Sequence, residues 1–425
     1  MHGPPAPWQG RDRRPPPFAD QQQAHRNVQT EYCMSVGYDP QHHLYHSASL
    51  PAGHQYHVVA LLLQGGGALG SYQPGVYQGL AEAELHPNWV AGISIGALNA
   101  AIIAGNPPNK RVDQLRRFWE TICQPPLLPA TPLNQLDTSR WPDPLQHMLA
   151  GWEAWRSMLE GQNGFYRPRL PWALQQASKP SEISFYDTSP LKQTLEQLAD
   201  FDRINDSRQM RVSVGAVNVR SGNFVYFDNT RQKLRPEHFI ASGALPPGFP
   251  AVEIDGEFYW DGGVVSNTPL SQLISKENRH NTLAFQVDLW SARGNLPGNM
   301  KEVAMRQKDI QYSSRTRMVT DVLRQELQYR ELLSELMTLV PESEHGSPAY
   351  LAARHAANCQ RLNVVHLIYQ DKIYDDHYKD YQFGLQTMRQ HWHSGYQDIR
   401  NSLRRPGWLN MPSAEQPFVS HDIHR

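Results

Sequence analysis

The residues Trp89-Val90-Ala91-Gly92-Ile93-Ser94-Ile95-Gly96 form the most informative stretch of the sequence. The first three are apolar and predict a short strand, and the small residues of 97–104 predict a helix that packs closely on a sheet. Ser94 would then lie on a tight strand-to-helix turn with its Oγ at the carboxyl edge of the sheet, where Gly92 and Gly96 let neighbouring backbone approach. Ser94 is therefore a candidate nucleophile, although a pattern this short also occurs by chance.

A similar strand–turn–helix unit precedes this stretch. The run Val58-Val59-Ala60-Leu61-Leu62-Leu63 is continuously apolar, which is typical of a strand buried on both faces, as in a parallel sheet. Gly65-Gly66-Gly67 interrupts the run, and residues 74–84 predict a helix. Two such units in close succession predict an α/β sandwich with crossover helices and a mostly parallel central sheet.

Sheet-forming sequence resumes after residue 210. A strand is predicted at 211–217, and the turn Arg220-Ser221-Gly222-Asn223 joins it to a second strand at 224–227. Another hairpin turns at Asp255-Gly256, and its outgoing strand leads to Asp261. The other expected elements are a short helix at 238–243, a strand at 282–289, long helices at 302–339 and 379–403, and a strand at 364–369.

The composition divides the chain into three expected parts. Residues 1–55 are rich in Pro, Gln and His and predict a flexible tail, 56–292 an α/β domain, and 293–425 a mainly helical extension without an assignable motif. Residues of about 125–180 are rich in Pro and Trp and indicate an insertion. Its tryptophans either fill a small helical core, which we slightly favour, or form a lid or interfacial surface, because indole suits the lipid–water boundary.

Charge and cysteine content exclude several classes of protein. Lys and Arg number 40 against 41 Asp and Glu, so no net charge draws the chain to nucleic acid or an anionic membrane. No apolar stretch approaches the roughly 20 residues that span a bilayer. We expect a cytoplasmic protein with at most a transient, peripheral contact with a membrane surface. Its three cysteines are dispersed and follow no metal-ligand spacing: Cys33, Cys123 and Cys359.

The glycine-rich loop at Gly65–Gly70 has three interpretations. It can be a tight turn, a dinucleotide-binding loop, or an oxyanion hole whose backbone N–H groups face an oxygen that becomes negative. Dinucleotide binding would require an acidic residue near the end of the next strand, to hold the ribose. That strand instead ends at Ser94. The oxyanion hole is therefore favoured.

A serine hydroxyl needs a proton acceptor before it is a useful nucleophile. Asp261 lies at a predicted strand end and is followed by Gly262 and Gly263; an Asp-Gly-Gly sequence is ordinarily a turn, but the other two elements favour a catalytic role. A Ser-His-Asp enzyme of this architecture would carry a histidine after the acid. The candidates lack a recognisable loop context: His280, His345, His355, His366 and His377.

Taken together, the glycine loop, the Gly-x-Ser-x-Gly turn and the Asp-Gly-Gly element resemble, in that order, the patatin-like phospholipase family. The resemblance covers about 56–290, and residues after 293 resemble the long C-terminal extension of a bacterial subgroup. Weaker likeness occurs at Phe185-Tyr186-Asp187-Thr188-Ser189-Pro190-Leu191 and Ser242-Gly243-Ala244-Leu245-Pro246.

The resemblance implies a three-layer α/β/α sandwich and a lipid acyl hydrolase with a Ser-Asp dyad. Ser94 would attack an ester carbonyl, Asp261 would act as general base, and the amides of Gly65, Gly66 and Gly67 would hold the oxyanion. The family requires no metal or cofactor, and Gly70 completes its loop motif. One departure is Leu69, which stands where the family often has Arg or Lys.

Three alternatives stay open at this point. The chain could be a Ser-His-Asp esterase, a nucleotide-binding module that uses the glycine loop, or a non-catalytic interaction protein that acts through its C-terminal helices. The sequence does not fix which lipid or ester is the substrate, its chain length or headgroup, or the oligomeric state.

Overall fold

The computed structural model describes residues 56–124, 142–169, 179–274, 278, 280–313, 316–357, 360–371, 375, 378–413 and 415–424. The predicted tail and part of the insertion, including Trp141 and Trp172, lie outside the described residues. The helices, in chain order, are α2 Tyr72–Glu82, α3 Ile95–Ala104, α4 Arg111–Ile122, α5 Asp143–Glu160, α6 Ser189–Leu198, α7 Phe201–Ile204, α8 Pro236–Ser242, α9 Met300–Tyr312, α10 Thr316–Met337, α11 Pro348–Ala356 and α12 Leu385–Leu403.

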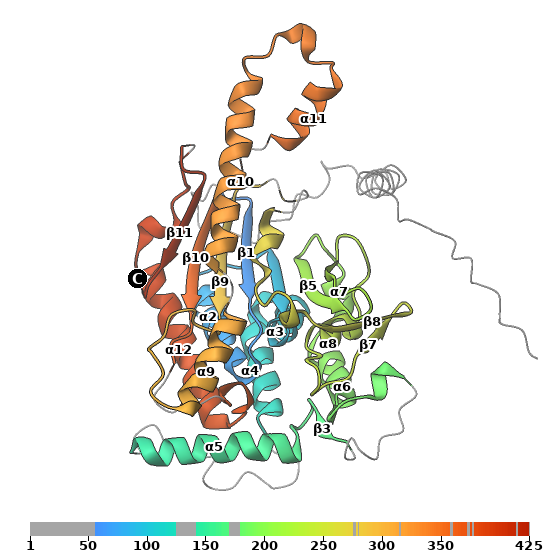
Figure 1. Ribbon diagram of the computed structural model, residues 1–425, viewed down its shortest axis with the longest axis vertical. Helices are drawn as coiled ribbons and strands as arrows, with labels where there is room; N and C mark the ends of the chain where they lie inside the picture. The colour runs from blue at the N-terminus through green and yellow to red at the C-terminus, as the bar shows by residue number, and fades with distance from the viewer. Residues whose placement is uncertain are drawn as a thin grey trace, which may run out of the picture. The chain divides into compact units, whose positions relative to one another are not determined.

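The strands form one large sheet and one short ribbon (Figure 1). In the described residues the large sheet has the order β11-β10-β9-β1-β2-β5-β8-β7, and β6 also pairs with β5. From β11 to β5 all neighbours are parallel, whereas β6 and β8 run antiparallel to β5. The strands are β1 Val58–Leu63, β2 Trp89–Ile93, β3 Arg167–Pro168, β4 Tyr186–Asp187, β5 Arg211–Asn218, β6 Phe224–Asp228, β7 Val252–Ile254, β8 Glu257–Asp261, β9 Thr282–Asp288, β10 Leu362–Ile368 and β11 Phe418–Asp422.

The continuous apolar run of β1 has the cause that we predicted. Alternate residues of a strand face opposite sides of the sheet. Val59, Leu61 and Leu63 pack into a large core with residues of α2, α3, α4 and α12. Val58, Ala60 and Leu62 pack on the other face against the 3-10 helix η8 (Pro269–Ile274) and α10. The central sheet is therefore covered on both faces, and the predicted three-layer α/β/α sandwich is confirmed.

Both predicted hairpins are present, between β5 and β6 and between β7 and β8. The region after residue 293 is mainly helical, as predicted, but it also contributes to the sheet. β10 pairs with β9, and β11 pairs with β10. The helix predicted at 302–339 is two helices, α9 and α10, and the one predicted at 379–403 begins only at Leu385 after the 3-10 helix η10 (Lys379–Tyr381). None of the helices in the described residues is both long and apolar enough to cross a bilayer.

The insertion contains α5, and its tryptophans do not fill a core. Trp152 and Trp155 are 53% and 51% exposed. The interpretation of a helical subdomain packed around its own tryptophans is therefore wrong for these two residues. Ala154 and Ser157, which are neighbours of these tryptophans in the sequence, are buried. The opposite face of α5 therefore packs on the body of the molecule.

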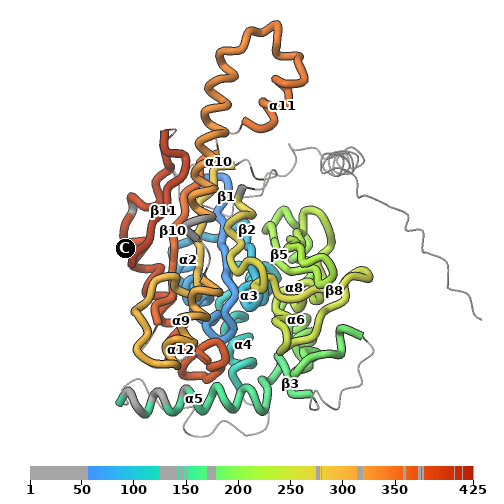
Figure 2. The backbone as a smooth tube through the Cα atoms, in the orientation of Figure 1, coloured from blue at the N-terminus to red at the C-terminus, as the bar shows by residue number. Residues whose placement is uncertain are grey.

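Helices α2 and α12 pack together although they lie at opposite ends of the described chain, as Figure 2 shows. Their contact depends on glycine at the crossing. A Cβ on Gly395 would lie 2.1 Å from the carbonyl oxygen of Tyr72, and one on Gly75 would lie 1.9 Å from that of Trp392. Backbone cannot yield as the tip of a side chain can, so both positions require hydrogen in place of a side chain.

Replacing Gly395 with alanine should therefore destabilise the protein although alanine favours helix. Overpacking of this kind typically costs about 1–3 kcal/mol, and the propensity gain of roughly 0.5–1 kcal/mol offsets only part of it. Gly151→Ala in α5 is the matched control, since a Cβ there meets nothing within 4 Å. We expect urea unfolding to show lower stability for Gly395→Ala and unchanged or higher stability for Gly151→Ala. Equal midpoints for the two variants would contradict the crossing.

Candidate active site

Ser94 lies at the end of β2 in a backbone conformation that residues with side chains rarely adopt. Its φ is 57° and its ψ is −128°, and α3 begins at the next residue. Flanking glycines allow this turn. A Cβ on Gly92 would lie 2.4 Å from the Gly96 carbonyl oxygen, and one on Gly96 would lie 2.3 Å from that of Leu63. The predicted strand–turn–helix context of Ser94 is thus confirmed.

A second serine fixes the turn. The N–H of Ser94 donates to Ser242 Oγ at 3.0 Å, and Ser242 Oγ–H donates to the carbonyl oxygen of Gly215 at 2.6 Å. Ser242 is fully buried in α8, and Gly215 belongs to β5, the neighbour of β2. One hydroxyl therefore links the strained turn, a helix and the adjacent strand, and strain at a functional turn persists only where such surroundings determine it.

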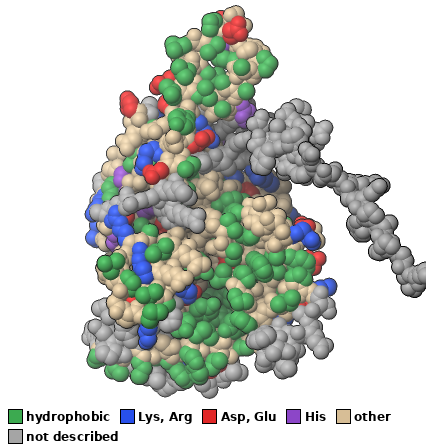
Figure 3. Space-filling view, in the orientation of Figure 1, with side chains coloured by type: hydrophobic (Ala, Val, Ile, Leu, Met, Phe, Trp, Pro, Cys, Tyr) green, Lys and Arg blue, Asp and Glu red, His purple; other side chains and the backbone are tan. Residues whose placement is uncertain are grey.

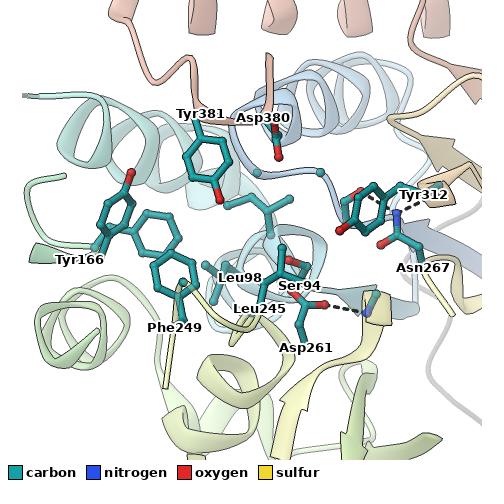
Figure 4. A pocket seen from close by; sticks show the side chains of 18 of the residues that line it. Ser94, Leu98, Tyr166, Leu245, Phe249, Asp261, Asn267, Tyr312, Asp380 and Tyr381 are labelled. Carbon is teal, nitrogen blue, oxygen red and sulfur yellow. Dashed lines mark hydrogen bonds between the residues drawn. The ribbon is translucent and has the colours of Figure 1, made fainter. Parts of the chain in front are cut away.

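Sheet register places Asp261 beside Ser94. Ile93 lies opposite Gly215 in the β2–β5 pair, and Ala216 lies opposite Asp261 in the β5–β8 pair. Two strand ends that are far apart in the sequence therefore meet across β5. The side chains of Ser94 and Asp261 point toward one another at the floor of a pocket (Figure 4).

The Asp261 carboxyl is buried, with 2% of the residue exposed. Burial disfavours the ionised form and raises the pKa of Asp261 to about 7, while hydrogen bonds from Ser94 and from the Gly263 N–H partly counter that increase. The Gly263 N–H donates to Asp261 Oδ1 at 2.7 Å. A carboxyl with this pKa accepts and returns a proton near neutral pH.

The glycine loop begins where β1 ends, on the other side of Ser94. Trp290 Nε1–H and Asn267 Nδ2–H donate to the Gly65 carbonyl oxygen at 2.8 and 3.0 Å. Gly65 N–H donates to the Asn267 carbonyl oxygen at 3.4 Å. The N–H groups of Gly66 and Gly67 have no hydrogen-bond acceptor in the part of the chain that the structure describes. The loop is held through the Gly65 carbonyl, and in the described residues it leaves two amide donors without an acceptor in the pocket that Ser94 also lines.

The positive φ of 55° at Gly67 and its surroundings explain why the loop ends in glycine. A Cβ on Gly67 would lie 2.3 Å from the carbonyl oxygen of Asp380, in the 3-10 helix η10. Leu69, two residues further on, is fully buried in the core. The apolar side chain that replaces the family's frequent Arg or Lys at this position therefore packs in the core.

The pocket above Ser94 and Asp261 has a mainly aromatic wall. Figure 4 shows Tyr166, Phe249 and Tyr381 on one side and Tyr312 with Asn267 on the other. Among the described residues, the charged side chains that line it are Asp261 and Asp380. The other lining side chains are Ile95, Leu98, Phe165, Tyr186, Leu245, Trp290 and Phe383, with glycines 65, 66, 67, 243, 248 and 263.

In the described part of the chain, no histidine lines this pocket. Of the candidates for a triad, His366 lies 3.8 Å from Asp288 and His345 stacks on Tyr350. His280 packs near His57, and His377 lies outside the described residues. The geometry therefore favours Asp261 over a histidine as the partner of Ser94.

Several residues of the site were missed in the sequence. Ser242 and Asn267 stand near predicted motifs, and Asn267 lies four positions after Gly263, so both could have been suspected. Tyr312, Asp380, Tyr381 and Phe383 belong to a region without a recognisable motif. Only the three-dimensional structure brings them to the glycine loop.

Comparisons with known proteins agree with this architecture. A family model described as patatin-like phospholipase matches residues 61–274, and one described as patatin phospholipase matches residues 310–415. No curated protein matches the chain.

Similar solved structures include VipD from Legionella pneumophila, at 14% identity and a TM-score of 0.34, covering 88% of this chain and 72% of VipD. Human GIVD cytosolic phospholipase A2 has 14% identity and a TM-score of 0.29, with 63% and 47% covered. ExoU of Pseudomonas aeruginosa, solved with SpcU, has 17% identity and a TM-score of 0.24, with 69% and 61% covered.

The two family matches together span both the three sequence motifs and C-terminal residues that line the pocket. They support hydrolysis of lipid esters over nucleotide binding or a purely structural role. The chain belongs to the patatin-like phospholipase family.

Proposed function

We propose that the protein is a serine lipid acyl hydrolase in which Ser94 is the nucleophile and Asp261 the general base. The observation that carries the proposal is the Ser94 hydroxyl, held on a strained turn beside a buried carboxyl whose pKa is raised to about 7. A base with a pKa near the operating pH is the most effective proton acceptor.

The reaction has two halves. Ser94 Oγ attacks the carbonyl carbon of the ester while its proton passes to Asp261. The tetrahedral intermediate expels the alcohol, which takes the proton from Asp261, and leaves an acyl group on Ser94. Water then attacks the acyl-enzyme and gives a proton to Asp261; the fatty acid leaves, and Ser94 recovers its proton.

The N–H groups of Gly66 and Gly67 hold the oxyanion in this proposal. Both are free of internal acceptors in the described residues, whereas the Gly65 N–H faces the Asn267 carbonyl oxygen. Gly65 therefore anchors the loop through its own carbonyl, which Trp290 and Asn267 grip. Donors fixed before the reaction stabilise developing charge without reorganisation.

The pocket lining suggests how a substrate lies. An acyl chain would pack against aromatic side chains such as Phe165, Phe249 and Phe383, because burial of apolar surface is favourable. The charged side chains that line the pocket in the described chain are both acids, so none of them would pair with a phosphate. The phosphate of a phospholipid would stay outside the pocket. The protein would reach its substrate by transient, peripheral association with a lipid surface.

Ser94→Ala should abolish hydrolysis of short p-nitrophenyl esters and labelling by a fluorophosphonate probe, because Ser94 carries the hydroxyl that hydrogen-bonds to the Asp261 carboxyl in the pocket that the loop glycines also line. Ser266→Ala is the matched control, since Ser266 lies near the site but does not line the pocket. We expect that control to keep its activity and labelling. Full activity of Ser94→Ala, with a circular dichroism spectrum that shows a folded protein, would rule out Ser94 as the nucleophile.

The rate should depend on pH through Asp261. The base works only when ionised, so kcat/KM should rise about tenfold per pH unit below about 7 and level off above it. The measurement uses a short aliphatic ester, with the released acid quantified by chromatography. A flat profile between about pH 5 and pH 8 would contradict a base with this pKa.

Asp261→Asn should inactivate the enzyme and stabilise its fold at alkaline pH. Folding raises the pKa of Asp261 from 3.8 to about 7, so the native protein loses stability as pH rises between these values. The amide has no such penalty, and the variant should gain up to about 4 kcal/mol above pH 7 and little near pH 4. Urea unfolding at both pH values measures this; a gain that is equal at both would contradict a buried, titrating Asp261.

A further inference from the structure

The outer face of α5 carries a row of exposed apolar side chains. They recur at intervals of three and four residues, which places them on one side of a helix. The rings of Trp152 and Trp155 stack on one another at 5.3 Å. We call this set the α5 stripe; its members are Leu145, Met148, Trp152, Trp155 and Leu159.

The inner face of the same helix supports the wall of the pocket. Ser157 Oγ and the Tyr166 hydroxyl hydrogen-bond at 2.6 Å, and the Tyr186 hydroxyl donates to the Met158 carbonyl oxygen at 2.8 Å. Tyr166 and Tyr186 both line the pocket above Ser94. One face of α5 therefore carries the exposed stripe, and another face contacts the tyrosines of the pocket wall.

Other exposed apolar residues adjoin residues that line the pocket. Phe185 directly precedes Tyr186, and Val264 directly follows Gly263. In the face shown in Figure 3, hydrophobic side chains gather along the lower edge, where α5 lies in Figure 1, and in the area directly above it. Exposed apolar side chains that gather in one area usually mark an interaction site on a protein surface.

Charge decides between the surfaces that could cover the stripe. The stripe contains no charged residue. Of the charged side chains described on α5, Glu153 faces inward to Thr387, and Arg156 lies 3.9 Å from Glu160. The described part of α5 therefore offers no unpaired cation that would attract anionic lipid. Stacked indoles with aliphatic neighbours instead suit the interface of a zwitterionic or neutral lipid surface.

We propose that the α5 stripe docks the protein on a zwitterionic or neutral lipid surface by apolar insertion and so brings the pocket to its substrate. The inference rests on the proposed function, because a lipid ester is what the pocket would collect from that surface. Binding through the stripe does not itself need catalysis, so the two can be tested separately.

The experiment measures binding to phosphatidylcholine vesicles by flotation, using the full chain with Ser94→Ala so that no lipid is consumed. Trp152→Ser with Trp155→Ser should lower the partition coefficient at least about tenfold. The matched control is Leu332→Ser with Leu336→Ser on α10, whose side chains are both 51% exposed. In Figure 1 α10 rises to the upper end of the view and α5 crosses the lower end. Binding by this control should be unchanged.

Further measurements separate the competing outcomes. Binding should be insensitive to salt and to added phosphatidylserine, since it is not electrostatic. In the protein with Ser94 intact, loss of the two tryptophans should lower hydrolysis of vesicle lipid but leave hydrolysis of a short water-soluble ester unchanged. Equal binding by both double variants, loss of binding at high salt, or conversion of a dimer into monomers in light scattering would each overturn the proposal. Failure of the short-ester reaction alone would instead contradict the proposed function.

Discussion

The backbone of Ser94 is the constraint on which the site depends. A φ of 57° at the end of a buried strand needs close backbone approach on both sides, and Gly92 and Gly96 provide it. The turn then has to be held, and Ser242 ties its N–H to the β5 strand. β5 in turn carries β8 on its other edge and so brings Asp261 to the same place. The strained residue, its partner acid and the order of the strands are one arrangement.

Burial of Asp261 gives that arrangement its chemistry and also its weakness. Burial raises the pKa of Asp261 to about 7, which makes its carboxylate a stronger base. The same burial lowers the fraction of protein in which the carboxyl is ionised, and the proposed reaction requires the ionised form. An acid exposed to solvent would be ionised more readily and would be a weaker base. Stability and activity therefore make opposite demands at this position, because the proposed reaction needs a buried carboxylate whose ionisation destabilises the fold.

The sequence predicted the parts of the structure that are local and periodic. The apolar run of β1, the two hairpins and the Gly-x-Ser-x-Gly turn follow from residues close to one another, and each is present. The exposure of Trp152 and Trp155 agrees with the alternative that we favoured less, an exposed surface, because composition does not say which face of a helix packs. The contribution of Tyr312 and Tyr381 to the pocket was also hidden, because it depends on contacts between segments more than 200 residues from the glycine loop.

Those distant contacts mean that the segment carrying the three motifs is not a complete site. Asp380 packs its backbone against Gly67, and the Tyr312 carbonyl oxygen accepts hydrogen bonds from Asn267 and Gln64, which hold the loop. η10 is fixed by Lys379, fully buried, whose Nζ lies 2.7 Å from Asp309 and 2.6 Å from Asp371.

Burial alone would lower the pKa of Lys379, but the two carboxylates more than offset it and raise the pKa, so the cation persists. Removing either carboxylate would leave a buried charge short of partners, which is strongly destabilising. The region after residue 293 therefore acts on the glycine loop through a buried ionic anchor and a backbone contact. The same region also lines the pocket with Tyr312, Tyr381 and Phe383, so it both supports the loop and forms part of the pocket wall.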